Sequence, residues 1–145
     1  MGGTNRPNHL KWRMWAVVAV GGAFGAAARE AFSLLIPAAD GVPVAIATVN
    51  ILGAFLLGVL YEALTRPGIP GDRASRLKLL LGTGFCGGFT TYSSLAVDAA
   101  LLGIHGHPGT ALLYVFGTVA LGACATWAGI VLGSRSTKNA REGSR

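Results

Sequence analysis

Residues 82–94 read GTGFCGGFTTYSS and decide the fold, because they interrupt an apolar run that is otherwise long enough to cross a membrane. The segment holds four glycines and five serine or threonine hydroxyls. In hydrocarbon, unpaired backbone amides and carbonyls are costly, so irregular backbone persists there only when it is buried in protein or lines a polar cavity. The segment therefore predicts an ion site within the membrane.

The composition of the whole chain is that of an integral membrane protein. Of the 145 residues, 52% are hydrophobic and 12% are charged, and the mean hydropathy is +0.54, which is too apolar for an ordinary soluble domain. Four stretches are long and apolar enough to cross a bilayer, at about residues 14–36, 44–64, 77–102 and 110–132. We therefore predict an all-α fold with one membrane domain over residues 1–145, carrying short, disordered basic tails at 1–11 and 134–145.

The basic residues fall on one side of the predicted membrane. The net charge is +6, and of the 12 Lys and Arg residues only Arg29 belongs to the side opposite the N-terminus, the 65–76 connection and the C-terminus. The positive-inside rule then places both termini in the cytoplasm of a multi-pass plasma-membrane protein. This placement accounts for the charge without nucleic acid, so we expect contact with membrane lipid and no nucleic-acid partner.

Residue types associated with metals and catalysis are sparse in the spans. Cys86 and Cys124 both fall in apolar spans, where a thiol most often acts as a small hydrophobic side chain. The three histidines lie outside the spans, and no CxxC or HExxH pattern occurs. Transition-metal chemistry thus has no support, and we do not expect an enzyme.

Polar side chains recur at two further places in the spans. Asn50 lies midway along the second span, where an amide costs free energy unless it is hydrogen-bonded, so it either ties helices together or contacts a polar substrate. A polar or small stripe at i+4 spacing follows one face of the fourth span: Tyr114, Thr118, Gly122 and Thr126. The stripe is either a polar track or a set of threonines bonded to their own preceding carbonyls beside small packing residues.

Charged residues lie near the ends of the spans. Arg29 closes a small-residue run near the outer end of the first span, where it either reaches the headgroups or anchors an anion vestibule or a neighbouring loop. Glu30, Glu62 and Asp98 also lie near span ends. The absence of a mid-membrane carboxylate from the sequence argues against a proton-coupled antiporter.

Four stretches, taken in order along the chain, resemble the Fluc fluoride channel family, also called CrcB. They are GGAFGAAAR at 21–29, TVNILG at 48–53, GFCGGFTTYS at 84–93 and the stripe that starts at Tyr114. The resemblance implies a four-helix subunit with a broken third helix that forms an antiparallel dimer. It also implies two fluoride pores, a structural sodium ion at the two-fold axis that is not transported, and passive export of cytoplasmic fluoride, which reduces fluoride toxicity.

The resemblance implies roles for individual residues. The backbone carbonyls of Gly87 and Thr90 match the family's sodium ligands, which both subunits contribute. The residues that match the fluoride pore are Asn50, Tyr92, Ser93, Tyr114 and Thr118. Tyr92 conservatively replaces the first phenylalanine of the family's aromatic pair. Two positions depart further from the family pattern, since Leu95 stands where members carry the second phenylalanine and Gly122 where relatives carry a serine. The pore contacts at these two positions are therefore left open.

Two other classes of protein fit parts of the pattern. A small multidrug-type exporter also has four short helices, but it needs a membrane-embedded glutamate in the first helix, and this span has none before Glu30. A non-transporting membrane scaffold would need only the GxxxG pairs at 21/25, 84/88 and 129/133, which indicate tight helix packing.

The charge asymmetry also bears on the partner subunit. A subunit that inserts in both orientations needs nearly balanced Lys and Arg on its two sides, whereas this chain carries all but Arg29 on one side. We therefore expect an antiparallel dimer with a separately encoded, oppositely oriented homologue. A homodimer in which some chains insert inverted is the alternative.

Overall fold

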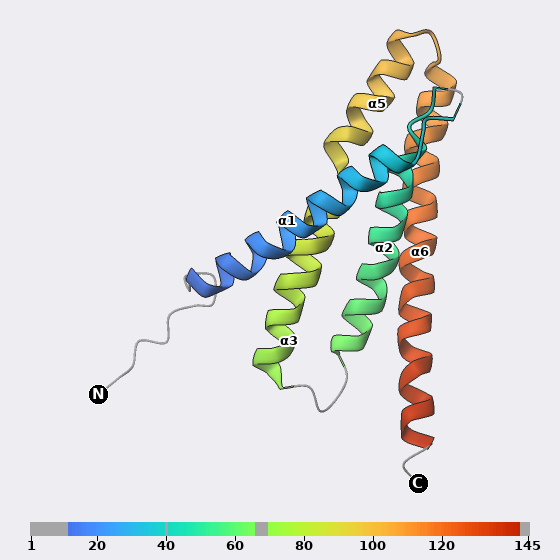
Figure 1. The fold of residues 1–145 in the computed structure, drawn as a ribbon. Coiled ribbons are helices and arrows are strands. Elements are labelled where there is room, and N and C mark those ends of the chain that lie inside the picture. The colour runs from blue at the N-terminus through green and yellow to red at the C-terminus, as the bar shows by residue number, and fades with distance from the viewer. Residues whose placement is uncertain (1–11, 40, 66–69, 143–145) are drawn as a thin grey trace.

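The computed structural model describes residues 12–39, 41–65 and 70–142 (Figure 1). Within these ranges every regular element is a helix, and the pairing of Ala39 with Val42 in the first connection is an isolated bridge. The all-α prediction is thus confirmed for the described residues. The N-terminal tail predicted at 1–11 lies outside them.

The described chain contains three long helices and one helical run in pieces. The long helices are α1 (Trp12–Leu35), α2 (Val44–Leu64) and α6 (Pro108–Glu142). The run in pieces comprises α3 (Gly71–Leu77), the π-helix η2 (Lys78–Cys86), α4 (Gly87–Phe89) and α5 (Tyr92–Ile104). The tight connections before α2 and α6 each use a glycine at positive φ, Gly41 at 78° and Gly106 at 86°.

Three of the helices are long and apolar enough to cross a membrane: α1, α2 and the 108–134 part of α6. They correspond to the predicted stretches at 14–36, 44–64 and 110–132. The remaining predicted stretch, 77–102, which is the third along the chain, is divided among η2, α4 and α5, and each of these is too short to span a bilayer alone. Its crossing of the membrane stays a prediction.

α6 is longer than the sequence analysis predicts. We expected a disordered tail at 134–145, but the helix continues through this polar segment to Glu142. Between Gly133 and Gly143 the segment contains no glycine or proline, and its Arg, Lys, Ala and Glu residues are good helix formers. Adding a residue to an existing helix is far easier than starting one, so the helix extends past the apolar span.

α2 and α6 lie side by side (Figure 1). Glycines bring the two backbones together, because a Cβ at Gly58 would overlap the carbonyl oxygen of Thr126 and one at Gly129 would overlap that of Phe55. The Thr126 hydroxyl also lies 3.3 Å from the Ala54 carbonyl oxygen and donates to it. Such close small-residue contacts are what holds helices together in lipid, where no hydrophobic force acts between them.

α1 packs on η2 and α4 in the same manner. Gly25 faces the carbonyl oxygen of Phe85, and Gly88 faces that of Gly22, so closely that neither position has room for a Cβ. The tight packing predicted from the GxxxG pairs is confirmed at these glycines and at Gly129. α1 therefore packs against the glycine-rich first half of residues 82–94.

A buried apolar cluster joins α5 to α6. It contains Leu95, Leu102, Ala111 and Tyr114, with Ile46 of α2 packed against it. The cluster holds α5 and α6 as a helical hairpin around the Gly106 turn (Figure 1). It thereby positions the residues at the start of α5.

Much apolar surface is exposed in the single subunit. Trp12 is 80% exposed, and Phe24, Phe116 and Trp127 are 69%, 68% and 69% exposed. In water a surface of this kind marks an association site or an aggregation hazard, whereas in a bilayer lipid tails or another subunit cover it. The distribution of apolar side chains is therefore that of a membrane protein.

Candidate functional site

The helical run from Gly71 to Ile104 is interrupted at Thr90 and Thr91. Both residues have extended backbone, with φ −83° and ψ 158° at Thr90 and φ −151° and ψ 123° at Thr91. α4 ends with two bonds to the Cys86 carbonyl oxygen, from the Thr90 N–H at 2.9 Å and the Thr90 hydroxyl at 2.8 Å. α5 begins with the Thr91 hydroxyl, which accepts from the Ser94 N–H at 3.2 Å as an N-cap.

Asn50 of α2 braces the extended residue Thr91. Its Nδ2 donates to the Thr91 carbonyl oxygen at 3.0 Å, and its Oδ1 accepts from the Thr91 N–H at 2.8 Å. One side chain thus satisfies both backbone groups of Thr91, each of which would cost about 1–3 kcal/mol if buried without a partner. Asn50 therefore ties α2 to the interruption, which is one of the two roles expected of it. Its second N–H has no partner among the residues that the structure describes.

The same bonds deprive two backbone carbonyls of their helical partners. In a continuous helix the Thr91 N–H would bond the Gly87 carbonyl, but here it donates to Asn50 Oδ1. The Ser94 N–H would bond the Thr90 carbonyl, but here it donates to Thr91 Oγ1. The carbonyls of Gly87 and Thr90 are the predicted sodium ligands. Hard cations prefer neutral and anionic oxygen ligands, so the donor set at the interruption fits the predicted ion.

A groove of about 300 Å³ opens beside the interruption. Its walls come from α2, the interrupted run and α6, and they combine amide and hydroxyl groups with apolar side chains: Asn50, Thr90, Thr91, Tyr92, Leu95, Thr118, Val119 and Gly122. Of the predicted pore residues, Asn50, Tyr92 and Thr118 are thus brought together. Leu95 and Gly122 line the groove as well, so the two departures from the family pattern shape this groove directly.

The threonines of the α6 stripe bond the preceding turn of their own helix. Thr118 is 6% exposed, and its hydroxyl donates to the Tyr114 carbonyl oxygen at 2.6 Å. The Thr126 hydroxyl shares its hydrogen between the Gly122 carbonyl oxygen of its own helix at 3.0 Å and the Ala54 carbonyl oxygen of α2 at 3.3 Å. A hydroxyl has one hydrogen, so Thr118 presents only lone pairs to the groove until it rotates away from that carbonyl. In this conformation both threonines of the stripe bond the preceding turn of their own helix, which is the second of the two interpretations given for the stripe.

Tyr114 is buried in the α5–α6 cluster and does not line the groove. Its hydroxyl lies 3.4 Å from Asp98 Oδ2 and 3.4 Å from the Pro43 carbonyl oxygen, which is long for hydrogen bonds between oxygens. Asp98 is a partner that the sequence analysis missed. A signal for it exists, because Asp98 and Tyr114 are equally distant from Gly106 in the sequence and a helical hairpin brings such positions together.

Three other predicted site residues lie off the groove. Ser93 is exposed, with its Oγ 3.2 Å from Thr91 Oγ1. Gly87 is exposed, and a Cβ there would meet no atom of this subunit within 4 Å. Arg29 lies half-buried on α1. The roles of these residues stay predictions.

The fold and the groove together define a class of protein. Membrane-length apolar helices, exposed apolar surface and a polar groove beside interrupted backbone are features of an integral membrane protein that handles an ion or a small polar solute. Residues 16–130 match the family described as CrcB-like protein, Camphor Resistance (CrcB). The chain belongs to this family.

Curated relatives are similar to most of the chain. The fluoride-specific ion channel FluC 2 of Leifsonia xyli subsp. xyli is 43% identical over 128 residues, which are 88% of this chain and 88% of the relative. The fluoride-specific ion channel FluC of Deinococcus radiodurans is 40% identical over 129 residues, 87% of this chain and 99% of the relative. The fluoride-specific ion channel FluC 1 of Mycobacterium tuberculosis is 42% identical over 127 residues, 87% of this chain and 93% of the relative. The resemblance to the Fluc family is thus confirmed.

Proposed function

We infer that this protein is a fluoride-specific ion channel that releases cytoplasmic fluoride passively across the cell membrane. The observation that carries the inference is family membership along residues 16–130, with relatives named as fluoride-specific channels over almost the same length. Fluoride enters cells as neutral HF, ionises at cytoplasmic pH and leaves down the inside-negative potential. A channel makes and breaks no covalent bond, so the protein is not an enzyme.

The groove carries the chemistry that fluoride needs. Fluoride is small, strongly hydrated and a strong hydrogen-bond acceptor, so a pore has to replace its water with donors. Neutral donors are available from the second N–H of Asn50, the hydroxyl of Tyr92 and, after rotation, the hydroxyl of Thr118. A fixed positive charge would hold the anion too tightly to release it, so neutral donors suit conduction. Ser93 and Tyr114 complete the proposed path outside the groove.

The interrupted run crosses the membrane as the third of four spans. Two contacts support this proposal, because η2 and α4 pack on α1 and α5 packs on α6. A segment held against membrane-length helices on both sides of its interruption passes through the same hydrocarbon layer as those helices. The extended residues at 90–91 are tolerated there because Asn50 satisfies the backbone of Thr91.

A second subunit in the opposite orientation completes the path. The groove is open at the surface of the single subunit, and Tyr92 beside it is 82% exposed. The exposed apolar side chains supply area for such a contact. Following the charge asymmetry, we place both termini in the cytoplasm and propose a separately encoded, inverted homologue as the partner, with self-pairing as the alternative.

A structural sodium ion lies between the two subunits, held by the Gly87 and Thr90 carbonyls of each. The proposal is supported by the loss of helical partners at both carbonyls and by the outward exposure of Gly87. The ion supplies positive potential near the path and is not transported. Exhaustive replacement of sodium by a large organic cation should weaken dimer assembly and fluoride flux. If dimer assembly and fluoride flux are the same with sodium and with the organic cation, the protein does not use a structural sodium ion.

Fluoride efflux from proteoliposomes tests the function. The purified protein is reconstituted with trapped fluoride, the membrane potential is clamped with valinomycin and potassium, and a fluoride electrode follows release. We expect the same release rate with and without a pH gradient. Release that requires a proton gradient would indicate a multidrug-type exporter. If no fluoride is released, either from the chain alone or from the chain together with an inverted homologue, the protein would be a non-transporting membrane scaffold.

A further inference from the structure

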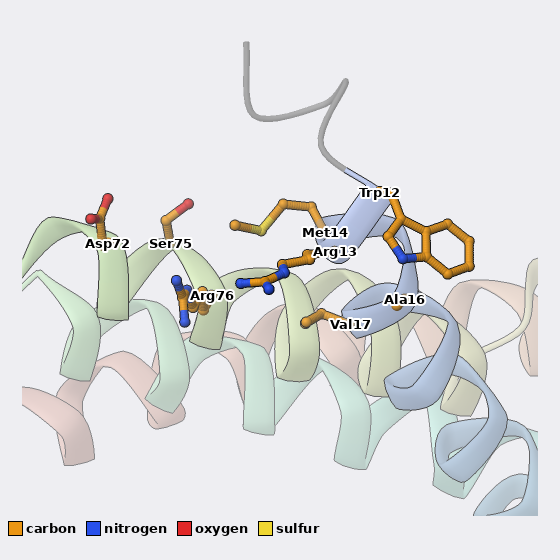
Figure 2. A pocket seen from close by; sticks show the side chains of 8 residues that line it. All are labelled: Trp12, Arg13, Met14, Ala16, Val17, Asp72, Ser75 and Arg76. Carbon is orange, nitrogen blue, oxygen red and sulfur yellow. The ribbon is translucent and has the colours of Figure 1, made fainter. Parts of the chain in front are cut away.

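A second cavity, of about 590 Å³, lies between the start of α1 and α3 (Figure 2). It shares no lining residue with the groove beside the interruption. α1 contributes Trp12, Arg13 and Val17 to its walls, and α3 contributes Asp72 and Arg76. The proposed fluoride path gives this cavity no role.

Two arginines from different helices face the cavity. Arg13 extends from α1 toward α3, and Arg76 projects from α3 (Figure 2). Neither guanidinium forms an ion pair or a hydrogen bond with another residue in the described part of the chain, although Asp72 lines the same cavity. Two arginines against one aspartate leave the cavity net positive. Like charges facing one space repel, and an anion between them relieves the repulsion.

The chemistry of the guanidinium group favours phosphate as that anion. Its planar set of N–H donors matches two phosphate oxygens at once. The one carboxylate in the cavity wall, Asp72, pairs with neither arginine in the described part of the chain. The cavity is much larger than a phosphate ion needs, since one water occupies only about 30 Å³ of liquid. Its volume lies instead in the range of about 300–1,000 Å³ that is typical of sites for larger organic molecules.

The remaining wall of the cavity is apolar and leads into the membrane. Trp12, Met14 and Val17 line it, and they belong to the beginning of the α1 span. Tryptophan is enriched at the membrane–water interface, and arginine beside it keeps its charge at headgroup level. A soluble anion has no use for the apolar wall. A phospholipid uses both walls, because its phosphate is charged and its acyl chains are not.

We propose that this cavity binds an anionic phospholipid, with its headgroup phosphate between Arg13 and Arg76 and an acyl chain along the start of α1. The bound lipid links α1 to α3. Because α3 continues directly into η2, the lipid steadies the helices that precede the interruption. The proposal concerns lipid binding alone, so its test does not depend on which ion the protein conducts.

Lipid titration of the full-length protein tests the site. The protein is purified in detergent, stripped of lipid, mixed with phosphatidylglycerol or phosphatidylcholine carrying the same acyl chains, and examined by native mass spectrometry. The wild type should retain phosphatidylglycerol at about a tenfold lower lipid concentration, equivalent to about 1.4 kcal/mol. Arg13→Gln and Arg76→Gln should each remove most of this preference. The matched control Arg73→Gln, which removes an exposed arginine of α3 outside the cavity, should keep it.

Three results would overturn the proposal. The wild type could retain the two lipids equally. Arg73→Gln could lose the preference as strongly as Arg76→Gln, which would make it an effect of net charge. Millimolar inorganic phosphate could displace phosphatidylglycerol, which would indicate a site for soluble anions. The first and third comparisons use the wild type only, so they decide the matter even if a variant fails to fold.

Discussion

The Asn50 amide holds both backbone groups of Thr91, and this explains how extended backbone persists beside apolar helices. The two bonds use Oδ1 and one N–H, so the second N–H of the amide is available to the groove that Asn50 lines. One side chain thus shapes the site and offers it a donor. At the residue scale, changes to Asn50 are therefore expected to affect stability and flux through different atoms.

The Asn50→Asp variant separates these two tasks. The carboxylate still accepts from the Thr91 N–H but cannot donate to the Thr91 carbonyl, so the subunit should lose about 1–3 kcal/mol of stability and remain folded. A negative charge beside an anion path should lower fluoride efflux by about a hundredfold, which corresponds to about 2.8 kcal/mol. Proteoliposome efflux and thermal unfolding in detergent measure the two effects.

The control for this variant is Thr48→Ala on the same helix. The Thr48 hydroxyl bonds the Val44 carbonyl oxygen of its own preceding turn at 2.8 Å and does not line the groove. Its removal should leave efflux near the wild-type rate. Wild-type efflux in Asn50→Asp would restrict Asn50 to tying the helices together.

Thr118→Val tests whether the stripe on α6 takes part in conduction. Valine keeps the shape of threonine and removes the hydroxyl, so efflux should fall about tenfold, or about 1.4 kcal/mol in the barrier. Thr126→Val is the matched control, because Thr126 also bonds its own preceding turn on α6 but does not line the groove. Equal efflux in the two variants would show that the stripe serves packing only.

At the element scale, hydropathy alone decides three of the spans, which is why the stretches at 14–36, 44–64 and 110–132 could be predicted closely. The glycines and hydroxyls of residues 82–94 predicted an interruption in that range. Its exact position at Thr90 and Thr91 could not be predicted, because it depends on bonds between Asn50 and Thr91, which are far apart in the sequence. The π-helix η2 was missed as well. The GxxxG pair at 84/88 predicts its close contact with α1, but that pair does not distinguish a π-helix from an α-helix.

Replacement by alanine is expected to change the stability of the subunit differently at the two neighbouring glycines of α4, Gly87 and Gly88. A Cβ at Gly88 would overlap the Gly22 carbonyl oxygen of α1, so Gly88→Ala should destabilise the subunit by about 1–3 kcal/mol. Gly87 has ordinary helical φ at −64° and open space around it, so Gly87→Ala should unfold at the wild-type temperature when monomeric. Thermal unfolding at monomeric dilution in detergent compares them. Equal losses of stability would contradict the packing of α1 on α4.

At the scale of the whole molecule, the candidate site is open at the surface of the single subunit. The groove is open, and Gly87 and Ser93 are exposed. Sequence analysis could name these residues from the family resemblance. In the proposed dimer the atoms that cover them belong to the second subunit, so the sequence of one chain does not reveal them. The one-sided distribution of Lys and Arg is the feature of this chain that bears on that molecule.

Labelling of the termini tests the expected orientation. A single cysteine is introduced into each tail in turn, in a Cys124→Ser background that removes the exposed native thiol. In intact cells both termini should resist an impermeant maleimide, because the positive-inside rule places them in the cytoplasm. Fluoride resistance in a sensitive host should then require an inverted homologue in addition to this chain. Equal labelling from both sides, with full rescue by this chain alone, would establish the homodimer.

The central claim is that the protein conducts fluoride selectively. Its most direct test is the release of fluoride and of chloride, measured side by side from proteoliposomes under the same potassium diffusion potential, with the chain reconstituted alone and together with an inverted homologue. The account predicts rapid loss of trapped fluoride and retention of chloride in at least one of these preparations. Equal release of the two anions, or retention of both in each preparation, would contradict it.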